Sequence, residues 1–120
     1  MTYDPWMATN GVIQHLEKVG YYNILDPIAQ TITYLSEPTK DLQKRLQRRE
    51  LDLMNNPVLR WMFRNVAIYT DQNLNIRLNK AKSTEKIDGC AASVNAIAGY
   101  ISKTANTREA YAGGREIKVI

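Results

Sequence analysis

Two aspartates and a group of lysines are the residues of this sequence best suited to chemistry on a phosphate group. Asp4 follows a short extended stretch, and Asp88 falls in the first turn of a predicted helix. Carboxylate oxygens are the ligands that Mg²⁺ and Mn²⁺ prefer. Cleavage of a phosphodiester by two metal ions requires several carboxylates that converge on one point. The lysines that precede the second aspartate are Lys80, Lys82 and Lys86.

Both aspartates also have a structural explanation. Asp4 precedes a predicted helix and could cap its free amides. Asp88 would interact favourably with the dipole of its own helix. Gly89 predicts open space beside the Asp88 carboxylate, which favours a bound cation there. The two aspartates are far apart in the sequence, so only the fold can bring them together.

The composition excludes several classes of site. The chain has 120 residues, of which one is cysteine and one is histidine. Cys90 therefore cannot form an internal disulfide or a zinc site of paired cysteines, and a His-rich metal site is excluded. No phosphate loop of the GxxxxGK[ST] type occurs, so no ATPase motif is present. No segment is apolar over the length that a membrane span requires, so we expect no membrane association.

The order of predicted elements indicates an α/β fold. The first four residues are typical of the end of a strand, and Pro5 can open a helix that Gly20 ends. Residues 21–26 predict a short strand, and residues 28–37 predict a connection or a second extended segment. Alternation of strands and helices favours the α/β class.

The second half of the chain predicts two more helices before a long C-terminal one. Pro38 can open a basic helix that residues 55–57 interrupt, and Pro57 can begin a short helix. Residues 65–70 and 76–78 predict a pair of strands around a turn. A polar loop follows, with Ser83 and Thr84 as candidate N-caps. The apolar stripe of the last helix comprises Ile87, Ala91, Val94, Ile97, Ala98 and Ile101. Residues 104–114 predict a loop, and residues 116–120 predict a short strand.

The positive charge is concentrated in the middle of the chain. Residues 38–86 contain eleven Lys or Arg against five acids, a net charge of +6, whereas residues 1–37 carry −3. Such a segment could face the phosphates of a nucleic acid. A solvated helix face would have the same composition.

Four stretches of the sequence resemble motifs of the nuclease domain of tailed-phage terminase large subunits. They are Tyr-Asp-Pro-Trp at 3–6, Leu-Ser-Glu-Pro at 35–38, Asn-Pro-Val-Leu-Arg-Trp-Met-Phe-Arg-Asn-Val at 56–66 and Lys-Ile-Asp-Gly at 86–89. Their order and spacing match throughout, and the resemblance covers residues 3–103. We therefore predict that residues 1–103 are the C-terminal portion of such a nuclease domain and that residues 104–120 are a tail.

The resemblance implies a fold, a reaction and a set of site residues. The fold would be ribonuclease-H-like, incomplete at its N-terminal strands. The reaction would be cleavage of concatemeric double-stranded DNA during packaging, with Mg²⁺ or Mn²⁺ held by three acids. Asp4 matches the second acid and Asp88 matches the third. Lys80, Lys82 and Lys86 would contact DNA.

The resemblance also implies what lies outside this chain. The first acid and the ATPase motor would lie upstream of Met1, on the remaining part of the large subunit. Further expected partners are the small terminase subunit and the portal, in the cytoplasm of a bacterial host. Two alternatives remain open from the sequence: an inactive prophage remnant, and a non-catalytic DNA-binding module that uses the basic middle segment.

Overall fold

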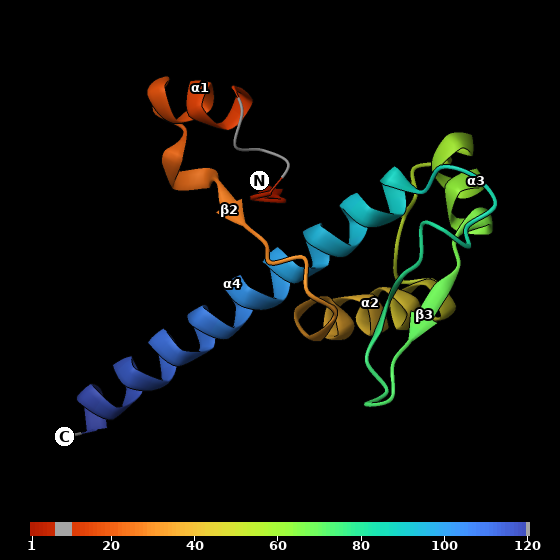
Figure 1. Cartoon of the computed structure of the whole chain (residues 1–120). Coiled ribbons are helices and arrows are strands. Elements are labelled where there is room, and N and C mark those ends of the chain that lie inside the picture. The colour runs from red at the N-terminus through yellow and green to blue at the C-terminus, as the bar shows by residue number, and fades with distance from the viewer. Residues whose placement is uncertain (7–10, 120) are drawn as a thin grey trace.

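A single long helix forms the axis of the molecule. The computed structural model describes residues 1–6 and 11–119, with side chains described through residue 110. The elements in chain order are β1 (Thr2–Tyr3), α1 (Val12–Lys18), the 3₁₀ helix η1 (Tyr22–Ile24), β2 (Asp26–Pro27), α2 (Ile32–Gln47), α3 (Pro57–Asn65), β3 (Ile68–Thr70), β4 (Ile76–Leu78) and α4 (Asp88–Val119). Figure 1 shows α4 running through the molecule from α3 to the C-terminus.

The strands form two small sheets, so the structure mixes helix and strand in a way that is compatible with the α/β class. β1 pairs in parallel with β2, and Thr2 lies opposite Asp26. β3 and β4 form an antiparallel hairpin in which Ile68 lies opposite Leu78. The hairpin confirms the predicted pair of strands around a turn. Asp71 closes that turn, because its carboxylate accepts hydrogen bonds from the backbone amides of Asn73 and Asn75.

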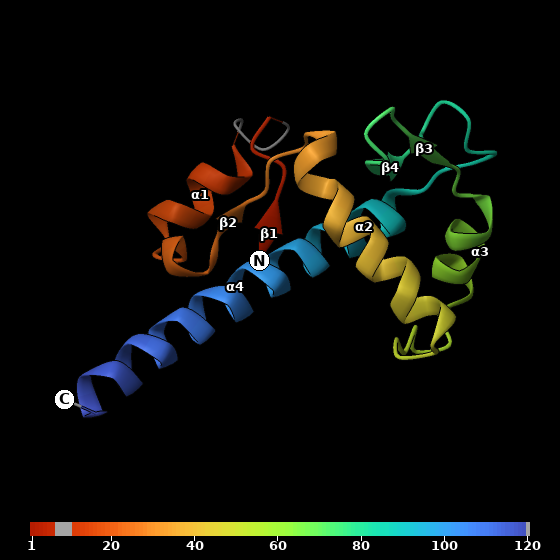
Figure 2. The same ribbon diagram turned by 90° about the horizontal axis from the view of Figure 1, so that it is seen from below.

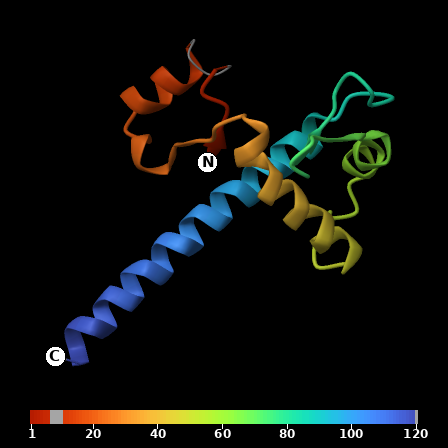
Figure 3. The same ribbon diagram turned by 60° about the horizontal axis from the view of Figure 1, so that its bottom comes forward.

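The core lies along one face of the first half of α4. Ile87, Val94 and Ala98 are almost completely buried there, which confirms the predicted apolar stripe. α2 crosses this face and contributes Leu42 to the same core (Figure 2). α3 packs near the first turn of α4, and β1 packs further along the helix (Figure 3). The N-terminal half of α4 thus contacts α2, α3 and β1.

The start of the chain differs from the prediction. Pro5 and Trp6 lie in a turn, in which the Trp6 amide donates to Asp4 Oδ1 at 2.9 Å, and α1 is described only from Val12. Residues 7–10 of the predicted helix lie outside the described residues. Gly20 does follow the end of α1, with a φ of 100° that suits glycine. The strand predicted over 21–26 was largely wrong, because η1 occupies its middle and β2 begins only at Asp26.

The prediction for residues 28–37 was wrong, because α2 begins at Ile32. The Thr31 hydroxyl caps this helix by accepting the Tyr34 amide at 3.3 Å. Pro38 was expected to open the helix but lies inside it, buried in the core. Proline removes one backbone hydrogen bond of a helix. The cap at Thr31 and the burial of this face offset that cost.

The last helix, α4, also differs from the prediction at both of its ends. It begins at Asp88, so neither Ser83 nor Thr84 caps it. It continues to Val119, so the predicted loop over 104–114 and the strand over 116–120 were wrong. The hydroxyls of Thr104 and Thr107 donate to carbonyls one turn earlier, which lets these residues stay helical. The proposed boundary after residue 103 falls inside this continuous helix.

The length and the polarity of the helices bear on membrane association. Within the part of the chain that the structure describes, none of them is long and apolar enough to cross a bilayer.

Cys90 provides a test of the packing of α4. Its side chain is fully buried, and burial raises the pKa of the thiol to about 11. The folded chain therefore keeps the thiol proton at pH values where the unfolded chain has lost it. We expect the stability of the native chain to fall as the pH rises from the ordinary thiol pKa toward 11. Urea unfolding at several pH values should show this slope.

The matched control for that measurement is Cys90→Ala. Other groups titrate in the same pH range, so the difference between the two proteins is the informative quantity. The Ala variant should lack the part of the slope that comes from the thiol. Identical slopes would show that Cys90 is not buried as described.

Candidate functional site

The lysine loop, residues 79–87, connects β4 to α4 and carries the predicted phosphate contacts. Asn79 begins it, and its amide donates to the Ala67 carbonyl at 2.8 Å, next to β3. The Asn79 side chain accepts the Lys82 amide, and its carbonyl accepts the Ser83 amide. These bonds fold the first half of the loop back on its own start.

Ser83 and Thr84 fasten the other half of the loop to the body of the protein. The Ser83 hydroxyl accepts the Ala67 amide at 3.0 Å and donates to the Asn79 carbonyl. The Thr84 amide donates to the carbonyl of Asn65, the last residue of α3. The loop therefore has a defined conformation, because side-chain and backbone bonds tie it to both α3 and the hairpin.

The loop brings Asp88 and the predicted lysines to one place. A cavity of about 430 Å³ is lined by Lys80, Ser83, Glu85, Lys86, Ile87 and Asp88. Lys82 lies on the same loop but does not line the cavity. Asp88 begins α4, where the free backbone amides favour a negative charge. Glu85 was not singled out from the sequence, although its position three residues before Asp88 could have indicated it.

The three lysines are available to an external anion. Among the described residues, the ion pairs are Arg45–Asp41, Arg48–Glu50 and Lys103–Asp26. None of these includes a residue of the lysine loop. By contrast, Arg45 on α2 is held by Asp41 at 2.8 Å and lies over the Tyr100 ring. Part of the basic segment is therefore structural, whereas the lysines of the lysine loop have no ion-pair partner among the described residues.

Gly89 has a different role from the one expected. Instead of leaving open space, it lets α4 approach α3 closely. A Cβ atom at this position would lie 2.7 Å from Leu59 Cδ1 and 2.8 Å from Met62 Sδ. The Gly89 amide also donates to Met62 Sδ at 3.2 Å. The prediction of space beside the carboxylate was wrong on this side, and the open side of Asp88 faces the lysine loop.

Asp4 lies elsewhere, at the end of β1. One of its carboxylate oxygens accepts the Trp6 amide, and the residue does not line the cavity of Asp88. Thr2, two residues earlier, packs against Gly99 of α4. Gly99 is about three turns beyond Asp88, roughly 16 Å along the helix axis. Asp88 thus begins α4, whereas Asp4 follows a strand that packs about three turns further along the helix.

The described residues do not form a complete metal site. Within the ranges that the structure covers, no three His, Cys, Asp or Glu residues are grouped as ligands for an ion. Asp88 and Glu85 supply two carboxylates to one cavity, with two lysines beside them. Three converging acids are what the resemblance implies, and this donor set falls short of that number.

The comparisons with known proteins identify the class of this chain. The family model of the terminase large subunit endonuclease domain matches residues 1–103. The chain belongs to this family. No curated protein and no solved structure matches it significantly. The match covers the lysine loop, Asp88 and Asp4, and it ends within α4.

The bonds of Ser83 yield a test of the lysine loop. Ser83→Ala would leave the half-buried Ala67 amide without its acceptor, at a cost of about 1–3 kcal/mol. Ser93→Ala is the control, because the Ser93 hydroxyl only donates to the Gly89 carbonyl one turn earlier in α4. Urea unfolding should show a loss of stability for the first variant and little change for the second. Equal effects would mean that Ser83 does not hold the loop.

Proposed function

We propose that this chain is the C-terminal part of a ribonuclease-H-like terminase nuclease that cuts concatemeric double-stranded DNA during packaging. The observation that supports this most is the cavity shared by Asp88, Lys80 and Lys86. A carboxylate next to free lysines is suited to a phosphodiester, since the lysines bind the phosphates and the acid belongs to the cleavage site. Membership of the family supports the same function.

The proposed roles of the residues follow the predicted motifs. Asp4 and Asp88 are proposed as ligands of Mg²⁺ or Mn²⁺, and Lys80, Lys82 and Lys86 as contacts to the DNA backbone. The acids grouped in the described part are too few for a complete site. We therefore propose that the remaining ligand comes from an upstream part of the large subunit. The small terminase subunit and the portal are proposed as further partners, in the cytoplasm of a bacterial host.

The residues of this chain have defined tasks in that proposal. The lysine loop holds the DNA backbone beside the first turn of α4, because its own hydrogen bonds fix its conformation. Asp88 stands in the first turn of α4, where the partial positive charge of the free backbone amides favours a carboxylate. Gly89 fixes the distance between Asp88 and α3. Positioning of a phosphate next to a fixed carboxylate is the contribution that these residues make to cleavage.

A nicking assay tests this function. The chain is combined with the upstream part of the large subunit, and conversion of supercoiled plasmid is followed with Mn²⁺. We expect Asp88→Ala to lower the rate of nicking by about 100-fold or more, because a contact made in the transition state is lost. Glu109→Ala, on the distal part of α4, is the matched control and should nick normally. Unchanged nicking by Asp88→Ala would contradict the catalytic assignment.

Two other functions give different results in the same experiments. An inactive prophage remnant would not nick under any condition. A DNA-binding module without catalysis would bind DNA in the absence of metal, through the net charge of +6 in residues 38–86. Its affinity would fall steeply with salt. The described ion pairs of Arg45 and Arg48 reduce the charge that such a module could offer.

A further inference from the structure

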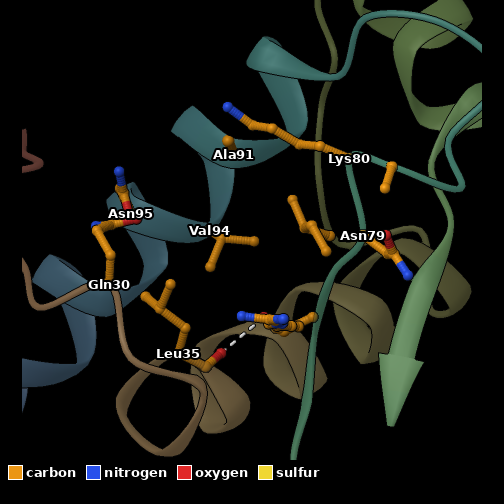
Figure 4. A pocket seen from close by; sticks show the side chains of 11 residues that line it. Gln30, Leu35, Asn79, Lys80, Ala91, Val94 and Asn95 are labelled. Atoms are coloured by element: carbon orange, nitrogen blue, oxygen red, sulfur yellow. Dashed lines mark hydrogen bonds between the residues drawn. The ribbon is translucent and has the colours of Figure 1, made fainter. Parts of the chain in front are cut away.

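A second cavity adjoins the cavity of Asp88. It has a volume of about 370 Å³ and lies between α2, β4 and the first turns of α4 (Figure 4). Its lining residues are Gln30, Leu35, Thr39, Arg77, Leu78, Asn79, Lys80, Ala81, Ala91, Val94 and Asn95. Lys80 lines both cavities, so the two are neighbours. The volume lies in the range of roughly 300–1,000 Å³ that is typical of small-ligand sites.

One wall of this cavity is apolar and fixed. Leu35, Leu78 and Val94 supply it from α2, β4 and α4, and Val94 is only 2% exposed. Figure 4 shows the side chains of Leu35 and Val94 directed toward each other across the space. Such a wall favours a flat, partly apolar group over a bare ion, because contact with it removes apolar surface from water.

A pair of amides forms the polar part of the lining. Gln30 Nε2 donates to Asn95 Oδ1 at 3.2 Å and to the Ile28 carbonyl at 2.9 Å. These bonds fix the orientation of both side chains. Within the described part of the chain, no hydrogen bond involves Gln30 Oε1 or Asn95 Nδ2. One acceptor of Gln30 and one amide group of Asn95 therefore remain for a ligand, and groups of these kinds can complement the edge of a nucleobase.

The charges of the side chains that line the cavity indicate whether it attracts an anion or a cation. Arg77 and Lys80 are its charged residues, and no carboxylate is present among the lining residues. The Arg77 guanidinium lies 5.3 Å from the centre of the Tyr69 ring and has no ion-pair partner among the described residues. Two cations without an acid attract an anion, and Arg is well suited to phosphate oxygens.

We propose that this cavity binds one nucleotide of a DNA strand, next to the phosphate that the lysines hold beside Asp88. The base lies on the apolar wall and meets the Gln30–Asn95 pair, while its phosphate contacts Arg77 and Lys80. The proposal rests on the proposed function, because the bound nucleotide belongs to the DNA that is cut. It adds a subsite that neither the aspartates nor the rest of the lysine loop provide.

Nuclear magnetic resonance of the full chain tests this subsite directly. The side-chain amide signals of Gln30 and Asn95 are followed in the presence of EDTA, during titration with thymidine 5′-monophosphate, thymidine or inorganic phosphate. We expect the monophosphate to shift both signals and to bind at least about tenfold more tightly than either fragment, since base and phosphate contacts add. Equal shifts with phosphate alone would overturn the proposal.

Two variants and one control complete the experiment. Ala91→Leu fills the cavity without changing its charge, and Arg77→Ala removes an exposed cation without disturbing the core. Each should weaken binding of the monophosphate by about tenfold, Arg77→Ala because a charged contact is lost and Ala91→Leu because the added side chain occupies the space of the base. Lys44→Ala, on the exposed face of α2, should bind within about twofold of the native chain. Native affinity in both cavity variants would refute the subsite.

Asp88→Ala separates this inference from the proposed function. It should bind thymidine 5′-monophosphate with native affinity, whatever its effect on nicking. If Asp88→Ala no longer nicks DNA and thymidine 5′-monophosphate binds to neither the native chain nor this variant, the subsite alone is refuted. Nucleotide binding together with normal nicking by Asp88→Ala would refute the catalytic assignment and leave the subsite in place.

Discussion

Close approach of other elements to α4 is the constraint on which this structure depends. α3 meets α4 at Gly89, and β1 meets it at Gly99, where the Thr2 side chain occupies the space that a Cβ atom would need. α2 crosses between these two points, over the buried stripe that includes Val94 and Ala98. Small residues are required at such contacts, because interiors are packed too closely to admit an added methyl group without movement.

The candidate site is a consequence of this arrangement. The contact of Gly89 with Leu59 and Met62 sets the first turn of α4 beside α3, and the lysine loop spans the remaining distance to the hairpin. Ser83 and the Asn65 carbonyl then fix the loop. Asp88 and the lysines therefore occupy their positions because of packing and hydrogen bonding among groups that do not themselves meet a ligand.

The parts of the fold that the sequence predicted are those with local causes. Two short stretches on either side of the turn at Asp71 predicted the hairpin, and the apolar stripe predicted the first half of α4. Pro38 misled the prediction of α2, because the Thr31 cap seven residues earlier was the stronger signal. The end of α4 was also missed. Gly113 and Gly114 suggested a break there, but each costs a helix only about 1 kcal/mol.

The same distinction between local and long-range causes applies to the candidate site. Lys80, Lys86 and Asp88 are close in the sequence, so a loop before a helix was enough to bring them to one cavity. The position of Asp4 depends on how β1 packs against α4, which no local pattern reveals. The role of Gly89 was misjudged for the same reason, because Leu59 and Met62 are distant in sequence. The Gln30–Asn95 pair joins residues of two separate elements and likewise could not be predicted.

The central claim is that DNA meets this protein at the Asp88 end of α4. Affinity cleavage tests it, because the buried Cys90 leaves an introduced cysteine as the reactive thiol. An iron chelate is attached to Thr84→Cys, on the lysine loop, or to Lys18→Cys, on α1, and bound duplex DNA is exposed to ascorbate and peroxide. We expect strand cleavage from the probe at position 84 and little from position 18. Cleavage from position 18 alone would contradict the claim.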